Sequence, residues 1–373
     1  MRVIVVGAGV LGSMHAWQAV ERGHEVVHLE RESEARGASV RNFGLVWVSG
    51  RAAGEELEVA LRARELWERI GERVPGLRFR PNGSLTLART EAELAVAEAA
   101  VKLPDAEARG YRLLGPDEAR ALNPALRGQF LGALHCSRDA AVEPRVAQPA
   151  LRAALEASGR YTFLPGREVR ELVGDHAVRD DHGQLHRGDL VILCTGAWLG
   201  GLVRELAPDL PVRRVRLQMM QTDPLGETLT TSVADGDSFR YYPAFAGPEL
   251  DALRAAQPQP PVADEHKMQL LMVQRQDGGL TVGDTHEYDQ PFGFDVVEDP
   301  YEHLAGVAEE LLGRPLPKIR RRWAGVYAQC TDTTRVVHRQ QVAAGAWLVT
   351  GPGGRGMTCS PAIAEATADA AGL

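Results

Sequence analysis

The chain has 373 residues, of which 44% are hydrophobic and 25% charged, and its formal net charge is −8. This length exceeds what one ordinary core accommodates and predicts two domains. The acidic balance argues against a nucleic-acid partner, because such proteins are usually basic. The four cysteines lack zinc-like spacing, no apolar stretch is long enough for a membrane span, and the N-terminus does not have the form of a signal peptide. We therefore expect a cytoplasmic protein without a metal site.

The chain opens on a strand, a glycine-rich turn and a helix. Residues 3–6 form a β-branched run typical of a buried parallel strand, and a helical pattern runs over 11–22. Between them, Gly7, Gly9 and Gly12 have GxGxxG spacing. Gly7 allows the tight turn, Gly9 lets the backbone approach a pyrophosphate, and Gly12 packs the helix on the strand. This pattern predicts a dinucleotide site.

The next segments lengthen this site. The strand "EVVHLE" ends on Glu30, an acid placed to bind the ribose hydroxyls. The segment "RESEARGASVRNFGLV" follows as a loop, where a plain Rossmann dehydrogenase would start a helix, and it carries Arg31, Ser39 and Asn42. Such a loop can follow a long cofactor, although alone it could equally be an ordinary polar connection. The first unit by itself leaves NAD and FAD both open.

Several segments together resemble the FAD-dependent D-amino-acid oxidase superfamily, which includes glycine oxidase, sarcosine oxidase and D-amino-acid dehydrogenase. They occur in the expected order and cover nearly the whole chain. The segments are "VVGAGVLG…VVHLER", "GASVRNFG", "PNGSLTLART", "DAAVEPRVAQPALRAALEASG", "DLVILCTGAW", "WAGVYAQCTD" and "GPGGRGMTCSPA".

This resemblance implies an α/β fold in which a Rossmann-like FAD-binding domain is interleaved with an α+β substrate domain built on a mixed sheet. The FAD-binding domain would take residues 1–80, 142–215 and 321–373. The substrate domain would take 81–141 and 216–320.

Local patterns add detail to this arrangement. Residues 190–193 read as a buried strand ending at the cofactor, and "MQLLMVQRQDGGLTVGDT" reads as two strands joined by a glycine turn. The proline-rich stretch 243–262 lacks periodicity and predicts a surface loop or lid.

The C-terminal glycine turn should lie at the flavin end of the cofactor. Gly353, Gly354 and Gly356 would allow close approach to the ring, and Pro361 is expected in the first turn of the following helix. The amides at that helix N-terminus would favour negative charge on the flavin. Arg355 would serve either the ring or the substrate.

The motifs and the resemblance together predict non-covalent FAD and a set of residues that bind it. These are Gly7, Gly9, Val10, Leu11, Gly12, Glu30, Arg31, Ala38, Ser39, Asn42, Phe43, Gly44, Val169, Thr195, Gly196, Trp198, Gly353, Gly354, Arg355, Gly356, Met357 and Thr358. The sarcosine-oxidase branch links its flavin through a cysteine, whereas the matching position here is Gly325, although Cys330 is near.

The resemblance implies oxidation of a C–N bond in a small anionic amine, followed by hydrolysis of the imine. Relatives bind the substrate anion with an arginine, but the matching position here is Tyr327. Another arginine must therefore hold the anion, or the substrate is not a simple α-amino acid. The candidates are Arg240, Arg275, Arg335 and Arg355.

Two tyrosines and a histidine complete the predicted substrate site. Tyr241 and Tyr242 fall where relatives place substrate-facing tyrosines, and neighbours on a strand would face opposite ways. His286 follows a predicted strand in "VGDTHEYD". This segment, with the missing arginine, suggests a branch associated with aminophosphonates. The predicted catalytic residues are Tyr241, Tyr242, Arg240, His286, Tyr327 and Arg355.

Two alternatives to amine oxidation stay open. One is FAD-dependent oxidation of a 2-hydroxy acid, and the other is a flavin-bearing subunit that acts only in a hetero-complex. The electron acceptor would be oxygen or a quinone or other electron carrier.

Overall fold

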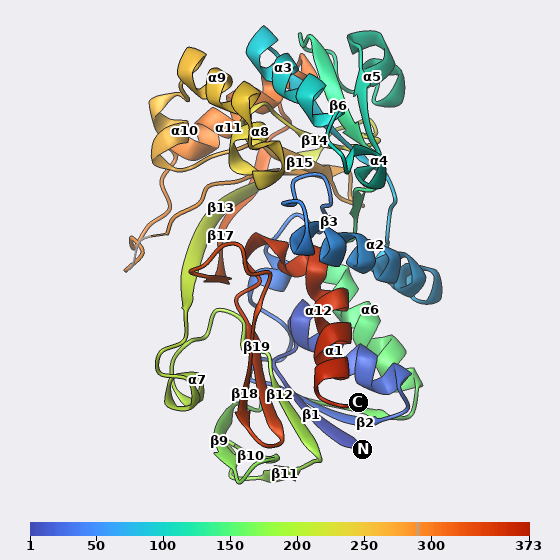
Figure 1. Ribbon diagram of the computed structural model, residues 1–373, viewed down its shortest axis with the longest axis vertical. Coiled ribbons are helices and arrows are strands. Elements are labelled where there is room, and N and C mark those ends of the chain that lie inside the picture. Colours follow the sequence, from blue (N-terminus) through green and yellow to red (C-terminus); the bar gives the residue numbers. More distant parts are fainter. Residues whose placement is uncertain (289–290) are drawn as a thin grey trace.

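Two β-sheets organise the molecule into two lobes (Figure 1), and the computed structural model describes residues 1–288 and 291–373. The first lobe is built on a six-stranded sheet with the order β18-β19-β12-β1-β2-β8, parallel except for the edge strand β18. Its strands are β1 (Arg2–Val6), β2 (Glu25–Glu30), β8 (Tyr161–Pro165), β12 (Leu190–Leu193), β18 (His338–Ala343) and β19 (Ala346–Thr350).

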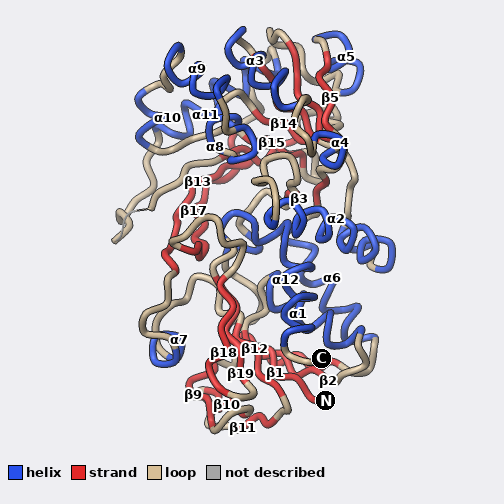
Figure 2. Tube along the Cα trace, viewed as in Figure 1, coloured by secondary structure: helices blue, strands red, loops and turns tan. Residues whose placement is uncertain are grey.

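Four helices cover one face of this sheet, and Figure 2 shows α1, α6 and α12 together on that side. Alternate residues of β1 point to opposite faces: Val3 and Val5 pack against the helices, whereas Ile4 and Val6 pack against a small second layer. The helices are α1 (Val10–Glu21), α2 (Glu55–Arg73), α6 (Pro144–Ala157) and α12 (Gly356–Ala370). The second layer contains β9 (Val169–Val173), β10 (Ala177–Asp180), β11 (Leu185–Arg187) and α7 (Leu202–Leu206).

The second lobe is built on an eight-stranded mixed sheet with the order β17-β13-β16-β15-β14-β4-β6-β5. Its strands are β4 (Ser84–Ala88), β5 (Tyr111–Leu114), β6 (Gly132–Cys136), β13 (Val212–Pro224), β14 (Ser232–Ala234), β15 (Leu271–Gln274), β16 (Gly279–Gly283) and β17 (Ile319–Cys330). The short pair β3 (Leu45–Val46) and β7 (Ala140–Ala141) lies between the lobes in Figure 1.

The helices of the second lobe lie on both faces of its sheet. Helix α11 packs on one face, and α3, α8 and α9 pack on the other together with Phe43, Leu45 and Trp47 of the first lobe. The helices are α3 (Glu91–Ala100), α4 (Ala106–Arg109), α5 (Pro116–Leu122), α8 (Asp237–Tyr241), α9 (Pro248–Ala256), α10 (Pro261–Glu265) and α11 (Asp299–Leu312). None of the helices in the described part of the chain combines the length and apolarity needed to cross a bilayer.

The predicted fold class is confirmed, because one lobe is built on a largely parallel sheet and the other on a mixed sheet. The predicted domain boundaries near 215 and 321 fall inside β13 and β17, which pair along their length from Val212–Cys330 to Thr222–Ile319. These two strands belong to the second sheet and also reach the first lobe (Figure 1), so the chain passes between the lobes in regular structure.

Three local predictions are corrected by the structure. The stretch 243–262 is not a loop, because it contains α9 and the start of α10; prolines at the first positions of these helices cost no hydrogen bond. Tyr241 ends helix α8 and is not in a strand. Pro361 lies inside α12 and not in its first turn, since the helix already begins at Gly356.

Candidate functional site

A single large cavity of about 1400 Å³ runs from the carboxyl ends of the parallel strands to the face of the second sheet. It is lined by β1–α1, the loop after β2, the strand end at Leu193 and the start of α12 on one side, and by β13, β17 and α8 on the other. Pockets for a drug-sized ligand span about 300–1,000 Å³. The larger volume fits an extended cofactor together with a substrate.

The glycines of the first turn have the conformations that a dinucleotide site needs. Gly7 has a φ of +96°, and a Cβ added there would lie 2.3 Å from the carbonyl oxygen of Cys194. A Cβ on Gly12 would lie 1.9 Å from the Gly7 carbonyl oxygen, so α1 packs tightly onto β1. Gly9 has only the Ser39 hydroxyl near its would-be Cβ, at 3.0 Å. The turn therefore keeps its backbone open to the cavity at the N-terminus of α1.

Side chains of the neighbouring loops fix this turn. Glu30 is buried and lines the cavity, and its carboxylate accepts hydrogen bonds from the backbone N–H of Ala8 (2.7 Å) and Glu32 (3.0 Å). Ser39 Oγ accepts from the N–H of Val10 at 2.8 Å. These bonds join the first turn to the loop that follows β2, as the predicted path of a long cofactor requires.

Aromatic and backbone groups line the wall beyond this turn. The guanidinium of Arg31 lies 4.5 Å from the ring centre of Trp198, which is half exposed. Thr195 Oγ1 donates to the Trp198 carbonyl oxygen at 3.1 Å, and Val169 also borders the cavity. This group could hold the adenosine part of a dinucleotide.

The C-terminal glycine turn meets the cavity at the start of α12. Gly353 has a φ of +64°, and residues 352–358 line the cavity. Thr358 Oγ1 accepts from the backbone N–H of Trp47 at 2.9 Å, which ties this turn to the segment that follows β3. The helix start therefore presents open backbone to the cavity.

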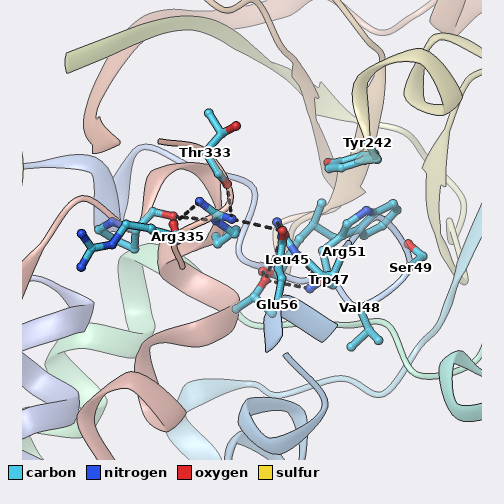
Figure 3. Close-up of polar contacts among 12 residues, drawn as sticks. Leu45, Trp47, Val48, Ser49, Arg51, Glu56, Tyr242, Thr333 and Arg335 are labelled. Atoms are coloured by element: carbon cyan, nitrogen blue, oxygen red, sulfur yellow. Dashed lines mark hydrogen bonds and ion pairs between the residues drawn. The ribbon is translucent and has the colours of Figure 1, made fainter. Parts of the chain in front are cut away.

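Arg355 is a member of a buried chain of three charges (Figure 3). Its Nη1 lies 3.1 Å from Glu56 Oε2, and Glu56 Oε1 lies 3.6 Å from Nη1 of Arg51. Arg355 also donates to the carbonyl oxygens of Thr333 (3.1 Å) and Arg335 (2.9 Å). Its donors are thus directed to the protein, and Arg51 is the second arginine that this chain brings to the cavity wall.

An aromatic wall forms the candidate substrate end of the cavity. Tyr241 and His286 stack with ring centres 4.2 Å apart, and His286 and Tyr288 stack at 6.3 Å. Tyr242 packs 6.0 Å from Trp47. Both neighbouring tyrosines line the cavity, because they leave the end of a helix and not a strand. Burial raises the pKa of Tyr241, so its phenol stays neutral at ordinary pH.

Four buried polar atoms in this wall have no hydrogen-bond partner among the described residues. Most buried polar groups are paired, so each such atom needs an explanation. A ligand bound in the cavity is one such explanation. The atoms are Trp47 Nε1, Gln269 Oε1, Asp284 Oδ1 and Tyr327 Oη.

The arginines proposed for the substrate anion have different surroundings. Arg240 does not line the cavity; its guanidinium binds Asp237 and the carbonyl oxygen of Gln257. Arg275 donates to Thr281 and to the carbonyl oxygens of Asn42 and Phe43, outside the cavity, and Arg335 is exposed. The structure therefore gives none of these three a contact with the cavity.

Arg213, which the sequence did not single out, does line the cavity. Its guanidinium lies 4.4 Å from the ring centre of Tyr288, and both Nε and Nη2 donate to Gln329 Oε1, at 2.9 and 2.8 Å. These partners are neutral, so its positive charge is not balanced by a carboxylate among the described residues.

Most of the predicted residues meet at this cavity. Of the predicted cofactor residues, only Gly12 and Gly44 do not line it; Gly44 instead has a φ of +74° and packs against the Val142 carbonyl. Of the predicted catalytic residues, only Arg240 lies elsewhere.

The residues that sequence reasoning missed come from segments without a motif. Asp284 directly follows a strand in the same segment as His286, which is the one signal that could have found it. Gln269, Arg51 and Trp47 have no periodic or spacing signal.

Comparison with known proteins places the chain. A family model described as DAO, FAD-dependent oxidoreductase, matches residues 2–370. The chain belongs to this family. It is 27% identical to a glycine oxidase of Pseudomonas aeruginosa, over 99% of this chain and 94% of that protein.

Solved structures of DAO-family enzymes share its fold. Glycine oxidase from Geobacillus kaustophilus superposes with a TM-score of 0.78 at 20% identity and covers 99% of this chain and 94% of its own. Iminodiacetate oxidase from Chelativorans superposes with a TM-score of 0.76 at 20% identity and covers 98% of this chain and 93% of its own.

As a member of the DAO family, the protein is an FAD-dependent oxidoreductase. The glycine turns, the buried Glu30 and the cavity volume fit this cofactor. When bound, FAD supplies a two-electron acceptor for the substrate, and the chain supplies binding and orientation.

Proposed function

We propose that this enzyme oxidises the C–N bond of a small anionic amine: an amino acid, an N-methyl amino acid or an aminophosphonate. The carbon that bears the amine would lose a hydride, for which bound FAD would supply the acceptor, and water would hydrolyse the imine. Residues of the aromatic wall hold the substrate, and the main support is the shared cavity, which joins the cofactor turns to a chamber lined with unpartnered polar atoms.

The cations beside this chamber support an anionic substrate. Arg213 has no carboxylate partner among the described residues, and the linked side chains Arg51–Glu56–Arg355 carry a net positive charge of one, with Arg51 at the cavity. Two separated cations suit a doubly charged phosphonate better than one arginine fork does, in line with Tyr327 at the position where relatives have an arginine. We favour Arg213 for the anion because its partners are neutral.

A screen of flavin bleaching without oxygen tests this function. The purified protein would be mixed with glycine, sarcosine, D-alanine, 2-aminoethylphosphonate and its N-methyl form, and then exposed to air. We expect at least one amine to bleach the flavin. Rapid return of colour in air would indicate oxygen as the acceptor, and slow return would favour a quinone or other carrier.

The aminophosphonate class is tested within the same screen. If glycine, sarcosine or D-alanine is turned over well and neither phosphonate reacts, the aminophosphonate class is wrong.

The mode of FAD attachment has its own test. Cys330 is buried and does not line the cavity, and Gly325 stands where a covalent link would require cysteine. We expect acid precipitation to release all of the yellow colour. Colour that remains with the precipitate would contradict non-covalent binding.

Oxidation of a 2-hydroxy acid is the alternative reaction. It predicts flavin bleaching by glycolate or a related hydroxy acid and no release of ammonia or alkylamine. Activity of the isolated chain would also exclude the hypothesis that it works only inside a hetero-complex.

A further inference from the structure

Asp284 is a buried acid at the substrate end of the cavity. It directly follows β16, is 5% exposed and lines the cavity. Its Oδ2 lies 3.7 Å from His286 Nε2, while Oδ1 has no hydrogen-bond partner among the described residues. A buried carboxylate oxygen without a donor is costly unless a ligand supplies one.

Gln269 provides a second acceptor in the same wall. Its Nε2 donates to Tyr242 Oη at 3.4 Å, which directs Oε1 elsewhere, and Oε1 has no partner among the described residues. The backbones of Gln269 and Asp284 are bonded to each other, since Asp284 N–H donates to the Gln269 carbonyl at 2.9 Å. The side chains are neighbours as well, because the Gln269 amide hydrogen-bonds the Asp284 carboxyl.

Two adjacent acceptors complement a group with several N–H donors. An ammonium has three donors and a positive charge, whereas a hydroxyl has only one donor. The surrounding rings of Tyr241, Tyr242 and Trp47 are also a favourable environment for a cation.

We propose that Asp284 and Gln269 form the subsite for the substrate ammonium, and that Asp284 accepts its proton before the C–N bond is oxidised. In this step one N–H bond breaks and one O–H bond forms on Asp284. The lone pair stays on nitrogen, so an ammonium and a carboxylate become a neutral amine and a neutral carboxyl. The proton-transfer part rests on the proposed amine oxidation.

His286 is placed to assist this transfer. Its Nδ1 lies 2.9 Å from the carbonyl oxygen of Lys267, which can only accept, so Nδ1 carries a proton. In the neutral ring, Nε2 is then an acceptor on the side of Asp284. His286 is thus a positioning residue that can share the proton taken up by Asp284.

The charge environment of Asp284 agrees with a proton acceptor. Burial raises the pKa of its carboxyl, and the charge of His286 and a hydrogen bond from Gln269 oppose this shift. The raised pKa of the carboxyl is closer to the pKa of an amine, so proton transfer from the ammonium to the carboxylate is less unfavourable. The titratable groups that face it in the described structure are His286, Tyr241, Tyr242, Tyr288 and Tyr327.

The test compares the FAD-loaded wild type with Asp284→Asn, which keeps the shape and removes the proton acceptor. Flavin bleaching by an amine would be followed without oxygen from pH 6 to 10. We expect the rate at pH 7 to fall by about 100-fold or more, the usual contribution of a proton acceptor. The remaining rate should climb with pH toward the ordinary pKa of the substrate amine. An unchanged rate and pH profile would overturn the proposal.

Asp235→Asn is the matched control. Asp235 is also buried, accepts a hydrogen bond from the backbone N–H of Leu270 beside Gln269, and does not line the cavity. Burial raises its pKa to about 8, so asparagine resembles its neutral form. We expect this variant to bleach like the wild type. An equal loss in both variants would overturn the assignment to Asp284.

A binding measurement separates this proposal from the proposed function. The probes are matched pairs, glycine with glycolate and 2-aminoethylphosphonate with 2-hydroxyethylphosphonate. Dissociation constants come from the saturation of the bleaching rate or, without bleaching, from the spectral shift of the oxidised flavin. We expect the wild type to bind the amine of a pair about 10- to 100-fold more tightly, as a charge-assisted hydrogen bond allows, and Asp284→Asn to lose this preference.

The outcomes are distinct. If no amine bleaches the wild-type flavin, the proposed function is contradicted, and the subsite is judged on binding alone. Equal binding of amine and hydroxyl probes by the wild type would overturn it. If Asp284→Asn does not retain FAD, Gln269→Leu removes the second acceptor and should lower the preference severalfold; an unchanged preference would overturn the subsite.

Discussion

We propose that the two ends of the cavity recognise their ligands by different means. The cofactor end uses backbone: Gly7, Gly9 and Gly353 keep the chain open, and Glu30 and Ser39 bind backbone N–H groups. The substrate end uses side chains from distant segments that meet only in the fold. A site built from backbone groups has a recognisable spacing of glycines in the sequence. A site built from side chains of distant segments has only single residues, which form no motif.

The largest expected effect on FAD binding is at the cofactor end. Gly7→Ala places a Cβ 2.3 Å from the Cys194 carbonyl in a turn with a φ of +96°. We expect FAD affinity to fall by about 100-fold, as for a misplacement of about 1 Å at a binding site. Retained flavin absorbance after gel filtration measures this.

Gly23→Ala is the matched control for this prediction. Gly23 has a φ of +84°, but nothing lies within 4 Å of its would-be Cβ. It should cost about 1–2 kcal/mol of unfolding free energy for its left-handed backbone and leave FAD binding intact. FAD retention by Gly7→Ala equal to that of Gly23→Ala would show that the first turn does not hold the cofactor.

The linked charges of Arg51, Glu56 and Arg355 give the largest expected effect on the free energy of unfolding. Glu56→Gln leaves Arg51 and Arg355 buried without their shared carboxylate, and we expect the free energy of unfolding in urea to fall by about 3–5 kcal/mol. Glu365→Gln removes the partly exposed pair with Arg62 and should cost about 0–1 kcal/mol. Similar losses in both variants would remove the structural role assigned to Glu56.

A smaller effect is expected for substrate binding alone. Arg213→Gln should raise the half-saturating concentration of an anionic amine by about 10- to 100-fold and leave the FAD content unchanged, because it removes a charge-assisted contact. Arg335→Gln, at an exposed position, should change neither quantity. If Arg51→Lys weakens substrate binding and Arg213→Gln does not, the substrate anion lies beside the start of α12.

The pH dependence of stability reports on Asp284. An unfolded aspartate has a pKa of about 3.9, and burial raises the folded value above it. Stability from the neutral carboxyl is therefore complete below about pH 3.9 and is lost as pH rises through the folded pKa. Asp284→Asn should thus gain stability relative to the wild type as pH rises above about 4. Parallel stability curves would show that the folded pKa is not raised.

The smallest effect is expected at the adenosine end. Trp198 is half exposed and stacks under Arg31, so Trp198→Ala should weaken FAD binding only about threefold, the effect of an exposed cation–π contact. A loss as large as that of Gly7→Ala would mean that side chains carry the cofactor end too.

The first lobe could be predicted from sequence because its geometry depends on residue types with few substitutes. Only glycine fits at positions 7 and 12. The apolar run at 190–193 predicts a buried strand, and β12 is that strand. The predictions failed where local signals were ambiguous. The prolines at 243–262 predict a loop, but two of them start helices. Tyr241 is predicted on a strand and lies at the end of a helix, because the local pattern is too short to distinguish a helix from a strand.

The substrate end could be predicted only in part. His286, Tyr241, Tyr242 and Tyr327 line the cavity as expected, whereas Arg240 binds Asp237 instead. Asp284 could not be recognised from sequence, because its unpartnered oxygen and its neighbour Gln269 become visible only when the sheet pairs them.

The release of nitrogen is the most direct test of the central claim, that the substrate end holds an amine for oxidation at its C–N bond. The wild-type holoenzyme would be reduced without oxygen by the amine that bleaches it best, and free ammonia or alkylamine would be measured against flavin reduced. The account predicts equal amounts of both. Flavin reduction by a hydroxy acid alone, with no nitrogen released from any amine, would contradict it.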